Sequence, residues 1–546
     1  MNDENYSWNY GDLFDEVEKV VPAEKPALIH GDKVISWKEF SARTNNTAQN
    51  LINDGFKPNE KIAFYMRNCT EYTEAVIASF KSRLVHVNVN FRYQAEEVNY
   101  ILSNSDSAIV IFAAEFSDIV SNAFNNDNQV RLWLYVEDDS GIEPPAFAKP
   151  YADYASRGNG KALDIKRDPK DIMLMYTGGT TGMPKGVMWE QQSLRQGLLI
   201  ASNPINPPKN CAEHIALLLE NGFGRSLLAC PPLMHGTSVW TSIHTLSEGG
   251  TIATMPGKTF DPGLVWEMAS KYRLEAIIIV GDVLARPLLT VLDKNADNYD
   301  LTSVANMASS GVIWSLECKQ RLLEYLPHCI LVDALGSSEG IGIGASAMTK
   351  DGMMGMDKAQ TGKFMAYDAV KVFSEDGREI LPGSDEPGLI ARCAPIPMGY
   401  YKDPEKTAKT FKTYNGKRYS IPGDFCRIAK DGSITLLGRG SGCINTGGEK
   451  VFPEEVEEAL KRHPNVEDAL VFGVDSARWG QEVSAVVRLE NANTFDREGI
   501  LASVREQLAG YKIPKKLFDS ADSYRAPNGK PDYVAAKTFF HAQLSR

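Results

Sequence analysis

The sequence predicts an α/β protein that has a large N-terminal domain of layered sheets with a small β-barrel-like part, followed by a small mobile α+β domain. Short apolar runs alternate with amphipathic stretches through most of the 546 residues. Between about 368 and 392, alternating strands joined by tight turns replace that pattern. A glycine-rich segment then interrupts a strand-like run. We therefore expect an N-terminal domain over 1–437, a hinge over 438–442 and a C-terminal domain over 443–546.

The individual elements follow from local patterns. Residues 61–65 read as a strand, and 68–82 as a helix with its apolar positions on one face. Residues 108–112 and 276–280 read as further buried strands. In the C-terminal domain, Pro453 predicts a helix start, with two glutamates in the first turn and Lys461, Arg462 and His463 in the last. The apolar residues Val456, Leu460 and Val466 are expected to form the buried side of this helix.

Composition excludes several classes of protein. A net charge of −12 with no dense basic cluster argues against nucleic-acid binding. The eight cysteines form no C-x-x-C pair and the eight histidines no zinc pattern, so we expect reduced thiols in a cytoplasmic protein. The N-terminus is acidic and polar, unlike a signal peptide, and no apolar run is long enough to span a membrane. Peripheral membrane contact and a homodimer both stay open.

Residues 176–187 have the sequence YTGGTTGMPKGV, and this segment indicates the ligand of the protein more specifically than any other part of the chain. Three of its four glycines, at 178, 179 and 182, allow backbone N–H groups to close on a phosphate, while three threonines and Lys185 add donors and a positive charge. The apolar residues 172–176 just before them indicate a buried strand that carries the loop. The segment is no Walker loop, because Pro184 precedes the lysine. The alternative is an ordinary polar turn.

This loop resembles, without a gap, the phosphate loop of the adenylate-forming superfamily, which comprises acyl-CoA synthetases, peptide-synthetase adenylation domains and luciferases. The resemblance implies an enzyme that activates a carboxylic acid with ATP, using Mg²⁺, and that takes CoA as co-substrate in its thioester-forming members. It also implies a set of phosphate-binding residues, of which Thr181 would contact the metal ion as well: Thr177, Gly178, Gly179, Thr180, Thr181, Gly182 and Lys185.

A second motif, DALGSSE at 333–339, follows the apolar residues 330–332 and is expected at the end of a strand. It is similar to the family's YGxTE motif, with Leu335 in place of the aromatic residue and Ser338 in place of the threonine. By this resemblance Glu339 is the magnesium carboxylate and Ser338 contacts a phosphate. The preceding residues would line the nucleotide site: Asp333, Ala334, Leu335 and Gly336.

Two further segments resemble the family's nucleoside site. Ser310 and Gly311 lie in a small-residue stretch similar to the adenine-binding loop. Asp424 lies in a motif similar to YxTGD, whose aspartate accepts hydrogen bonds from both ribose hydroxyls, and Arg439 would add a second contact. Taken alone, Asp424 would be a turn residue.

The C-terminal domain carries the remaining motifs. Lys530, in PNGKP, resembles the family lysine that bridges the substrate carboxylate and the α-phosphate during adenylation. Ser441 stands where the family has its hinge aspartate or lysine. Gly447, Gly448 and Glu449 resemble the segment that swings in after adenylation and lines the pantetheine tunnel. A point charge on a flexible stem suits a group that arrives and leaves with its domain.

The acyl site is expected around His235, Gly236 and Gly340. Amino-acid-activating members carry an aspartate at the position of Gly236, so a charged amine would be left unpaired here. The segment with the sequence GRGSGCINTGGEKV is similar to the corresponding segment of bacterial fatty-acyl and steroid-side-chain CoA ligases. These features predict an acyl-CoA ligase for a hydrophobic acid. Two alternatives stay open, namely an acyl-AMP ligase that loads a carrier protein and a nucleotide-binding homologue without turnover. Acyl length and ring content are not predicted.

Overall fold

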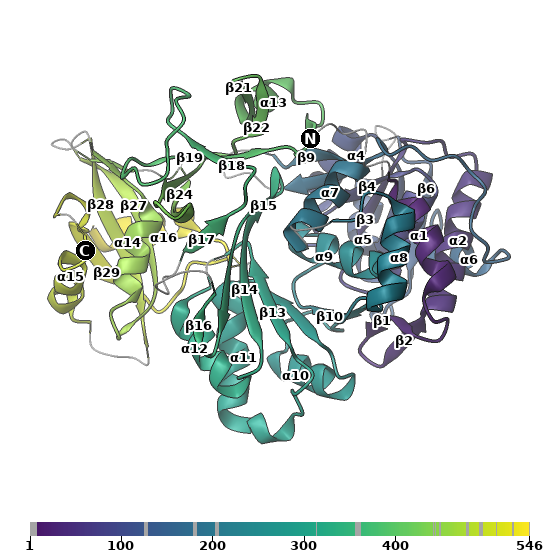
Figure 1. The fold of residues 1–546 in the computed structure, drawn as a ribbon, viewed down its shortest axis with the longest axis horizontal. Coiled ribbons are helices and arrows are strands. Elements are labelled where there is room, and N and C mark those ends of the chain that lie inside the picture. The colour runs from purple at the N-terminus through teal and green to yellow at the C-terminus, as the bar shows by residue number, and fades with distance from the viewer. Residues whose placement is uncertain are drawn as a thin grey trace.

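The computed structural model describes residues 8–124, 129–177, 183–202, 207–312, 314–354, 362–439, 442, 444–446, 449–476, 480–490, 495–508, 510–526 and 529–544. Three sheets organise the chain, and Figure 1 shows them side by side, with the C-terminal sheet at one end. The described part contains no helix that is both long and apolar enough to cross a bilayer.

The first sheet is mostly parallel and has the order β20 (Gly399–Tyr400), β9 (Lys185–Glu190), β8 (Ile172–Thr177), β4 (Val85–Asn88), β3 (Lys61–Tyr65), β5 (Ser107–Ala113), β6 (Leu132–Val136) and β7 (Lys149–Pro150). Its associated helices are α1 (Tyr10–Val20), α2 (Trp37–Asn53), α3 (Thr70–Lys81), α4 (Ala95–Ser105), α5 (Ser117–Ala123), α6 (Tyr151–Ser156), α7 (Gln191–Ser202) and α8 (Cys211–Asn221). The strands expected over 61–65 and 108–112 and the helix expected over 68–82 are thereby confirmed.

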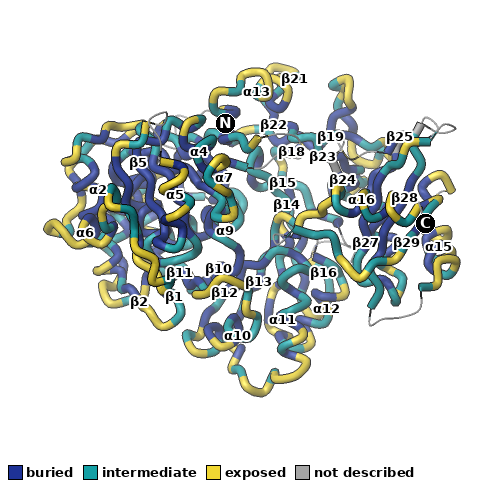
Figure 2. Tube along the Cα trace, turned by 180° about the vertical axis from the view of Figure 1, so that it is seen from behind, coloured by how far each residue is buried: buried dark blue, intermediate teal, exposed yellow. Residues whose placement is uncertain are grey.

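The second sheet begins as an α/β layer with the order β2 (Lys33–Ser36), β1 (Pro26–His30), β11 (Thr251–Thr254), β10 (Ser226–Ala229), β12 (Ala276–Ile279), β13 (Asn306–Ser310) and β14 (Ile330–Ser337). Further helices of this region are α9 (Gly236–Ser247), α10 (Pro262–Lys271), α11 (Gly281–Asn295) and α12 (Leu316–Tyr325). Burial follows this layering, because the strands form the dark-blue interior in Figure 2 and the exposed segments lie outside them.

The same sheet continues through antiparallel strands, where a small β-barrel-like part was expected. They follow in the order β15 (Gly340–Thr349), β17 (Lys363–Ala366), β24 (Ser433–Arg439), β23 (Asp424–Ile428), β19 (Gly388–Cys393), β22 (Lys417–Ser420) and β21 (Phe411–Tyr414), with β16 (Gly352–Met353) beside β15 and β18 (Val370–Phe373) beside β19. Helix α13 (Pro404–Thr410) lies between β20 and β21 along the chain. The change from parallel to antiparallel pairing occurs at the β14–β15 hairpin.

The third sheet consists of β26 (Glu449–Val451), β25 (Ile444–Thr446), β28 (Gly480–Leu489), β27 (Val466–Ser476) and β29 (Lys516–Asp519), with helices α14 (Pro453–Lys461), α15 (Arg497–Arg505) and α16 (Tyr533–Leu544). The chain leaves the second sheet after β24 and enters this one at β25, across the segment expected to be the hinge. The start of α14 at Pro453 is confirmed. The expectation for Val466 was wrong, because α14 ends at Lys461 and Val466 begins β27.

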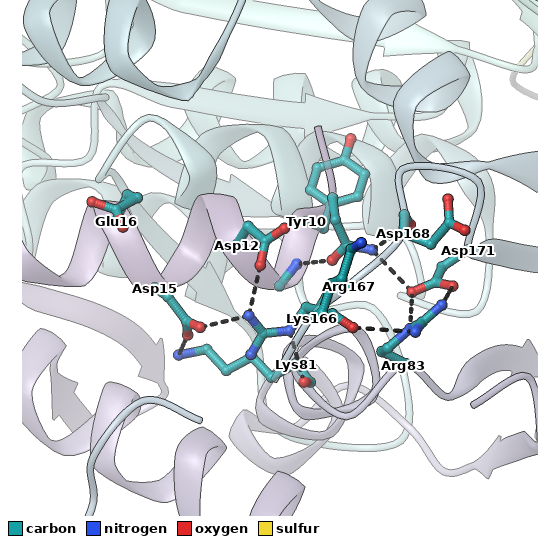
Figure 3. A network of polar contacts seen from close by, with 12 residues as sticks. Tyr10, Asp12, Asp15, Glu16, Lys81, Arg83, Lys166, Arg167, Asp168 and Asp171 are labelled. Atoms are coloured by element: carbon teal, nitrogen blue, oxygen red, sulfur yellow. Dashed lines mark hydrogen bonds and ion pairs between the residues drawn. The ribbon is translucent and has the colours of Figure 1, made fainter. Parts of the chain in front are cut away.

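A network of charged side chains fixes the start of β8 (Figure 3). Arg83 forms a two-pronged ion pair with Asp171, at 2.9 and 2.8 Å, directly before the first residue of β8. Arg167 pairs with Asp15 of α1 at 2.7 Å, and Lys81 of α3 pairs with the same carboxylate at 3.0 Å. Charge-assisted pairs of this kind give strong directional restraint. The strand that leads to the phosphate-loop segment is therefore held to two helices.

Candidate active site

The phosphate-loop segment connects two antiparallel strands. Strand β8 ends at Thr177 and β9 begins at Lys185, and these two residues face each other in the ladder. A return into a strand agrees with the exclusion of a Walker loop, which would lead into a helix. Five residues of the predicted phosphate site lie outside the described residues: Gly178, Gly179, Thr180, Thr181 and Gly182.

Lys185 forms an ion pair with Asp403, a residue that the sequence analysis did not single out. Asp403 is the N-cap of α13, where its other oxygen accepts from the backbone N–H of Lys406 at 2.8 Å. The hydrogen bond from Lys185 lowers the pKa of the Asp403 carboxyl. The sequence Asp-Pro-Glu signals a helix start, but nothing local in it predicts the contact across strands.

The β14–β15 hairpin holds the second motif. Strand β14 runs from Ile330 to Ser337, which confirms the expectation that the motif lies at the end of a strand, and Ser338 and Glu339 form the turn. Glu339 Oε1 accepts a hydrogen bond from the Tyr400 hydroxyl at 2.7 Å. The Ser338 carbonyl accepts one from Trp189 Nε1 of β9 at 2.9 Å. Both strands β9 and β20 therefore hold this turn next to the phosphate-loop segment.

The chemistry of this turn fits a magnesium ion. Mg²⁺ prefers oxygen ligands and is commonly bound through one or two carboxylates together with substrate phosphates. Glu339 supplies a partly exposed carboxylate of which the described contacts engage only one oxygen. The described residues include no cluster of three histidine, cysteine or acidic side chains that would make a self-sufficient metal cage. The site suits a metal ion that arrives with a nucleotide.

Within β14 the predicted nucleotide residues differ in their surroundings. The Asp333 carboxylate is buried and pairs with Lys319 Nζ of α12 at 3.0 Å, and burial raises its pKa. Leu335 is half-buried against an apolar cluster that includes Ile343 and Phe364. Ala334 and Gly336 follow the same strand, where Ala334 is the register partner of Ser310 in β13. Gly311 comes next with φ +91°, a conformation that favours glycine. The structure thus brings the predicted adenine segment beside the glutamate motif.

The predicted ribose residues face each other on neighbouring strands. Asp424 begins β23 and is the register partner of Arg439, the last residue of β24. Their separation in sequence gave no sign of this pairing. Both strands belong to the sheet that contains β14, which links them to the rest of the site through β15 and β17.

The loop that carries Lys530 packs on the N-terminal domain. A Cβ added to Gly529 would lie 2.5 Å from Val283 Cγ2 of α11 and 3.4 Å from Val312 Cγ2, next to the predicted adenine segment. Arg286 of α11 also pairs with Glu490 of the C-terminal domain at 3.8 Å. These contacts bring Lys530 to the N-terminal domain, although its position in the sequence lies far from the other motifs.

A brace within the C-terminal domain shapes the same loop. Arg525 binds both carboxylate oxygens of Asp468 in β27, at 2.6 and 2.8 Å. Its third nitrogen donates to the Gly529 carbonyl at 3.1 Å, and the Ala526 N–H donates to the Lys530 carbonyl at 2.8 Å. Gly529 takes φ +77° inside this tight turn. The backbone on both sides of Lys530 is therefore fixed by a charged pair that motif reading missed.

The predicted acyl-site residues lie on two elements joined by a pair of tryptophans. His235 is the N-cap of α9 and is half-buried, and desolvation, followed by the charge of Lys530, lowers its pKa to about 4. A Cβ on Gly236 would meet the Trp240 ring at 2.9 Å. Trp240 packs edge-on against Trp189, with ring centroids 6.1 Å apart, and Trp189 binds the turn that precedes Gly340. Gly236 thus borders the tryptophan pair, with His235 next to it in sequence and Gly340 two residues beyond the carbonyl that Trp189 binds.

The predicted CoA segment is described only in part. Ser441, Gly447 and Gly448 lie outside the described residues, and of Glu449 the structure describes only its place at the start of β26.

Comparison with known proteins identifies the family. The model of the AMP-binding enzyme family matches residues 14–401, and that of the AMP-binding enzyme C-terminal domain matches residues 455–530. The chain is 38% identical to a 3-oxocholest-4-en-26-oate–CoA ligase of Rhodococcus rhodochrous, covering 97% of this chain and 95% of the relative. It is 35% identical to the medium-chain acyl-CoA ligase Mig of Mycobacterium avium, covering 95% of this chain and 97% of that relative.

Solved structures show the same fold. The crystal structure of the anthranilate CoA ligase AuaEII with anthranoyl-AMP superposes with a TM-score of 0.82 at 19% identity, covering 99% of this chain and 98% of the other. The structure of ATP-bound MatB from Rhodopseudomonas palustris gives 0.78 at 22% identity, covering 97% and 99%.

Proposed function

The chain belongs to the AMP-binding enzyme family and is an AMP-forming acid–CoA ligase, and from this premise we propose that it activates a hydrophobic acid, either a fatty acid or a steroid side-chain acid. In the first half-reaction a carboxylate oxygen attacks the α-phosphorus of ATP, and the bond to the β-phosphate oxygen breaks to release pyrophosphate. In the second, the CoA thiolate attacks the acyl carbonyl, and the bond to AMP breaks.

Each charged residue of the site would have a separate role in these half-reactions. Glu339 would hold Mg²⁺, which neutralises phosphate charge when bound, and Lys185 would face the β- and γ-phosphates. Lys530 would place its charge between the substrate carboxylate and the α-phosphate, where negative charge develops. Asp424 would accept hydrogen bonds from the ribose. The packing of Gly529 against Val283 and Val312 is the observation that supports this arrangement most directly, because it brings the Lys530 loop next to the predicted adenine segment.

The second half-reaction would use a different placement of the C-terminal domain. The link between β24 and β25 is short and glycine-rich, and it is the expected hinge. Rotation about it would withdraw Lys530 once pyrophosphate has left and bring the segment of Gly447, Gly448 and Glu449 to the acyl-adenylate. We keep the boundaries 1–437, 438–442 and 443–546 for this movement.

Two observations favour a hydrophobic acid. The relatives named above are ligases for medium-chain acids and for a steroid acid. The expected acyl-site residue Gly236 lies against Trp240, which packs on Trp189, and glycine offers no carboxylate to pair an amino group at this position. A free amino acid would therefore be poorly held.

The substrate class is tested by measuring kcat/KM for acyl-CoA formation with a graded set of acids at fixed ATP and CoA. We expect kcat/KM to rise by about fourfold per added methylene until the site is filled, as expected for about 0.8 kcal/mol per buried CH₂. Direct competition between a fatty acid and a 3-oxosteroid side-chain acid then ranks the two classes. Equal rates with acetate and long acids would refute a hydrophobic acyl site. Transfer to a carrier protein but not to CoA would favour the acyl-AMP ligase.

A further inference from the structure

Strand β20 ties together the two elements that carry the phosphate chemistry. Its residue Tyr400 is the register partner of Val187 in β9, and the next residue, Tyr401, donates its N–H to the Gly186 carbonyl at 2.8 Å. Tyr400 itself reaches across to the β14–β15 turn, where its hydroxyl binds Glu339 Oε1 at 2.7 Å. One short strand therefore contacts both the phosphate-loop hairpin and the expected magnesium carboxylate.

Tyr400 is well placed to act as a rigid support. The residue is 5% exposed, and its ring packs edge-on against Phe411 with centroids 6.0 Å apart. Its backbone N–H donates to Thr407 Oγ1 of α13 at 2.9 Å. Contacts at its backbone, ring and hydroxyl already restrict this side chain, so it loses little further conformational entropy when it orients a neighbouring carboxylate.

A rigid hydrogen-bond donor would restrict the orientation of the Glu339 carboxylate. The carboxylate lies in a two-residue turn, and a glutamate side chain has several rotatable bonds that would otherwise sample many orientations. A hydroxyl bound to one oxygen restricts rotation of the carboxylate and leaves the other oxygen for a metal ion. Hydrogen-bond partners that orient metal-binding side chains commonly contribute 10- to 100-fold to metal affinity or activity.

We propose that Tyr400 is a positioning residue that orients the Glu339 carboxylate for the Mg²⁺ of Mg·ATP. The inference rests on the proposed function of Glu339 and extends it by one residue that no motif indicated. In this role Tyr400 acts through Glu339 and is not itself a catalytic residue.

The test replaces Tyr400 with phenylalanine, which removes only the hydroxyl. Tyr401→Phe is the matched control, because Tyr401 is the adjacent residue and its hydroxyl also binds a carboxylate, Asp106 Oδ2, at 2.8 Å. Calorimetric titration measures ATP binding with and without Mg²⁺. Separate assays measure adenylation as a function of Mg²⁺ and thioester formation from supplied acyl-adenylate.

We expect Tyr400→Phe to raise the Mg²⁺ concentration for half-maximal adenylation by about 10-fold and to weaken Mg·ATP binding by a similar factor. Metal-free ATP binding and thioester formation should keep their wild-type values, and Tyr401→Phe should match the wild type throughout. In a Glu339→Gln background, Tyr400→Phe should add little further loss.

Three results would overturn the proposal: an unchanged Mg²⁺ dependence in Tyr400→Phe, an equal loss of both half-reactions, or an equal loss of ATP affinity with and without metal. A wild-type protein that binds Mg·ATP but adenylates no acid would instead refute the proposed function. The calorimetric comparison would still decide the role of Tyr400 in that case.

Discussion

Lys185 already has an acidic partner before any nucleotide binds. Its ion pair with Asp403 lies at the end of β9, and both side chains are partly exposed, so the pair stabilises the fold only slightly. A triphosphate carries several negative charges and would compete with Asp403 for the same ammonium group. The sequence predicts Lys185 as a phosphate ligand, and the structure adds Asp403, the residue that would compete with the phosphates.

Asp403→Asn tests this competition. Asparagine keeps the N-cap of α13 but removes the charge, so we expect the KM for ATP to fall about two- to threefold at low salt. The difference should shrink as ionic strength rises. Asp261→Asn, which changes the N-cap of α10, is the matched control and should leave the KM for ATP unchanged. A higher KM for ATP in Asp403→Asn would mean that Asp403 helps ATP to bind.

At the scale of elements, the turn that presents Lys530 depends on β27. Arg525 donates hydrogen bonds to the carboxylate of Asp468 and to the Gly529 carbonyl. The conformation of the loop that carries Lys530 therefore depends on a residue of the neighbouring strand β27. A two-pronged arginine–carboxylate pair of this kind has a fixed geometry.

Asp468→Asn should therefore disturb the loop rather than the domain. We expect adenylation to slow by about 10-fold, the effect of misplacing a catalytic group by a fraction of a bond length, while thioester formation from acyl-adenylate is spared. Glu467→Gln is the control, because Glu467 is the neighbouring residue of β27 and pairs with Arg488 of β28 instead of Arg525. Partial-reaction kinetics on both variants check the prediction. Equal slowing of both half-reactions would point to general destabilisation.

Comparison of the elements with the sequence shows which features local patterns and motifs can predict. Local patterns predicted β3, β5 and α3, because apolar runs and apolar periodicity are the strongest local signals of secondary structure. Motif resemblance placed Glu339, Asp424 and Lys530, whose neighbours in sequence are distinctive. It missed Tyr400, Asp403, Arg525 and Trp240, which depend on contacts between distant segments such as β9 with β20. Apolar spacing also assigned Val466 to a helix that ends earlier, because such spacing alone does not separate a helix end from the next buried strand.

At the scale of the whole molecule, one buried and two half-buried histidines make stability depend on pH. Burial is the largest cause that lowers the pKa values of His86, His235 and His244 to about 4 each, below the ordinary value of 6.5. Between pH 6.5 and 4 these groups are therefore protonated in the unfolded chain but neutral in the folded one. Glu457 acts in the opposite sense, because burial raises its pKa to about 7.

The sign of the effect follows from proton binding. Near pH 5.5 the unfolded state gains three protons on these histidines and loses one on Glu457, so these four groups together take up about two protons on unfolding. The free energy of unfolding should then fall by about 2–3 kcal/mol per pH unit as the pH is lowered through this range. Calorimetric unfolding at pH 7.5 and 5.0 measures it. A midpoint temperature that is higher at pH 5.0 would contradict the assignment.

The central claim for the whole molecule is that adenylation precedes thioester formation and needs Lys530 from the C-terminal domain. Acid-dependent exchange of labelled pyrophosphate into ATP, measured without CoA, tests it most directly. We expect exchange with hydrophobic acids in the wild-type protein, and a loss of at least about 100-fold in Lys530→Ala, since a single transition-state charge contact is commonly worth 10²–10³. Lys516→Ala, a surface lysine of the same domain, should exchange normally, and Lys530→Ala should still convert supplied acyl-adenylate to acyl-CoA. Absence of exchange with every acid in a wild-type protein that binds ATP, or full exchange in Lys530→Ala, would contradict the account.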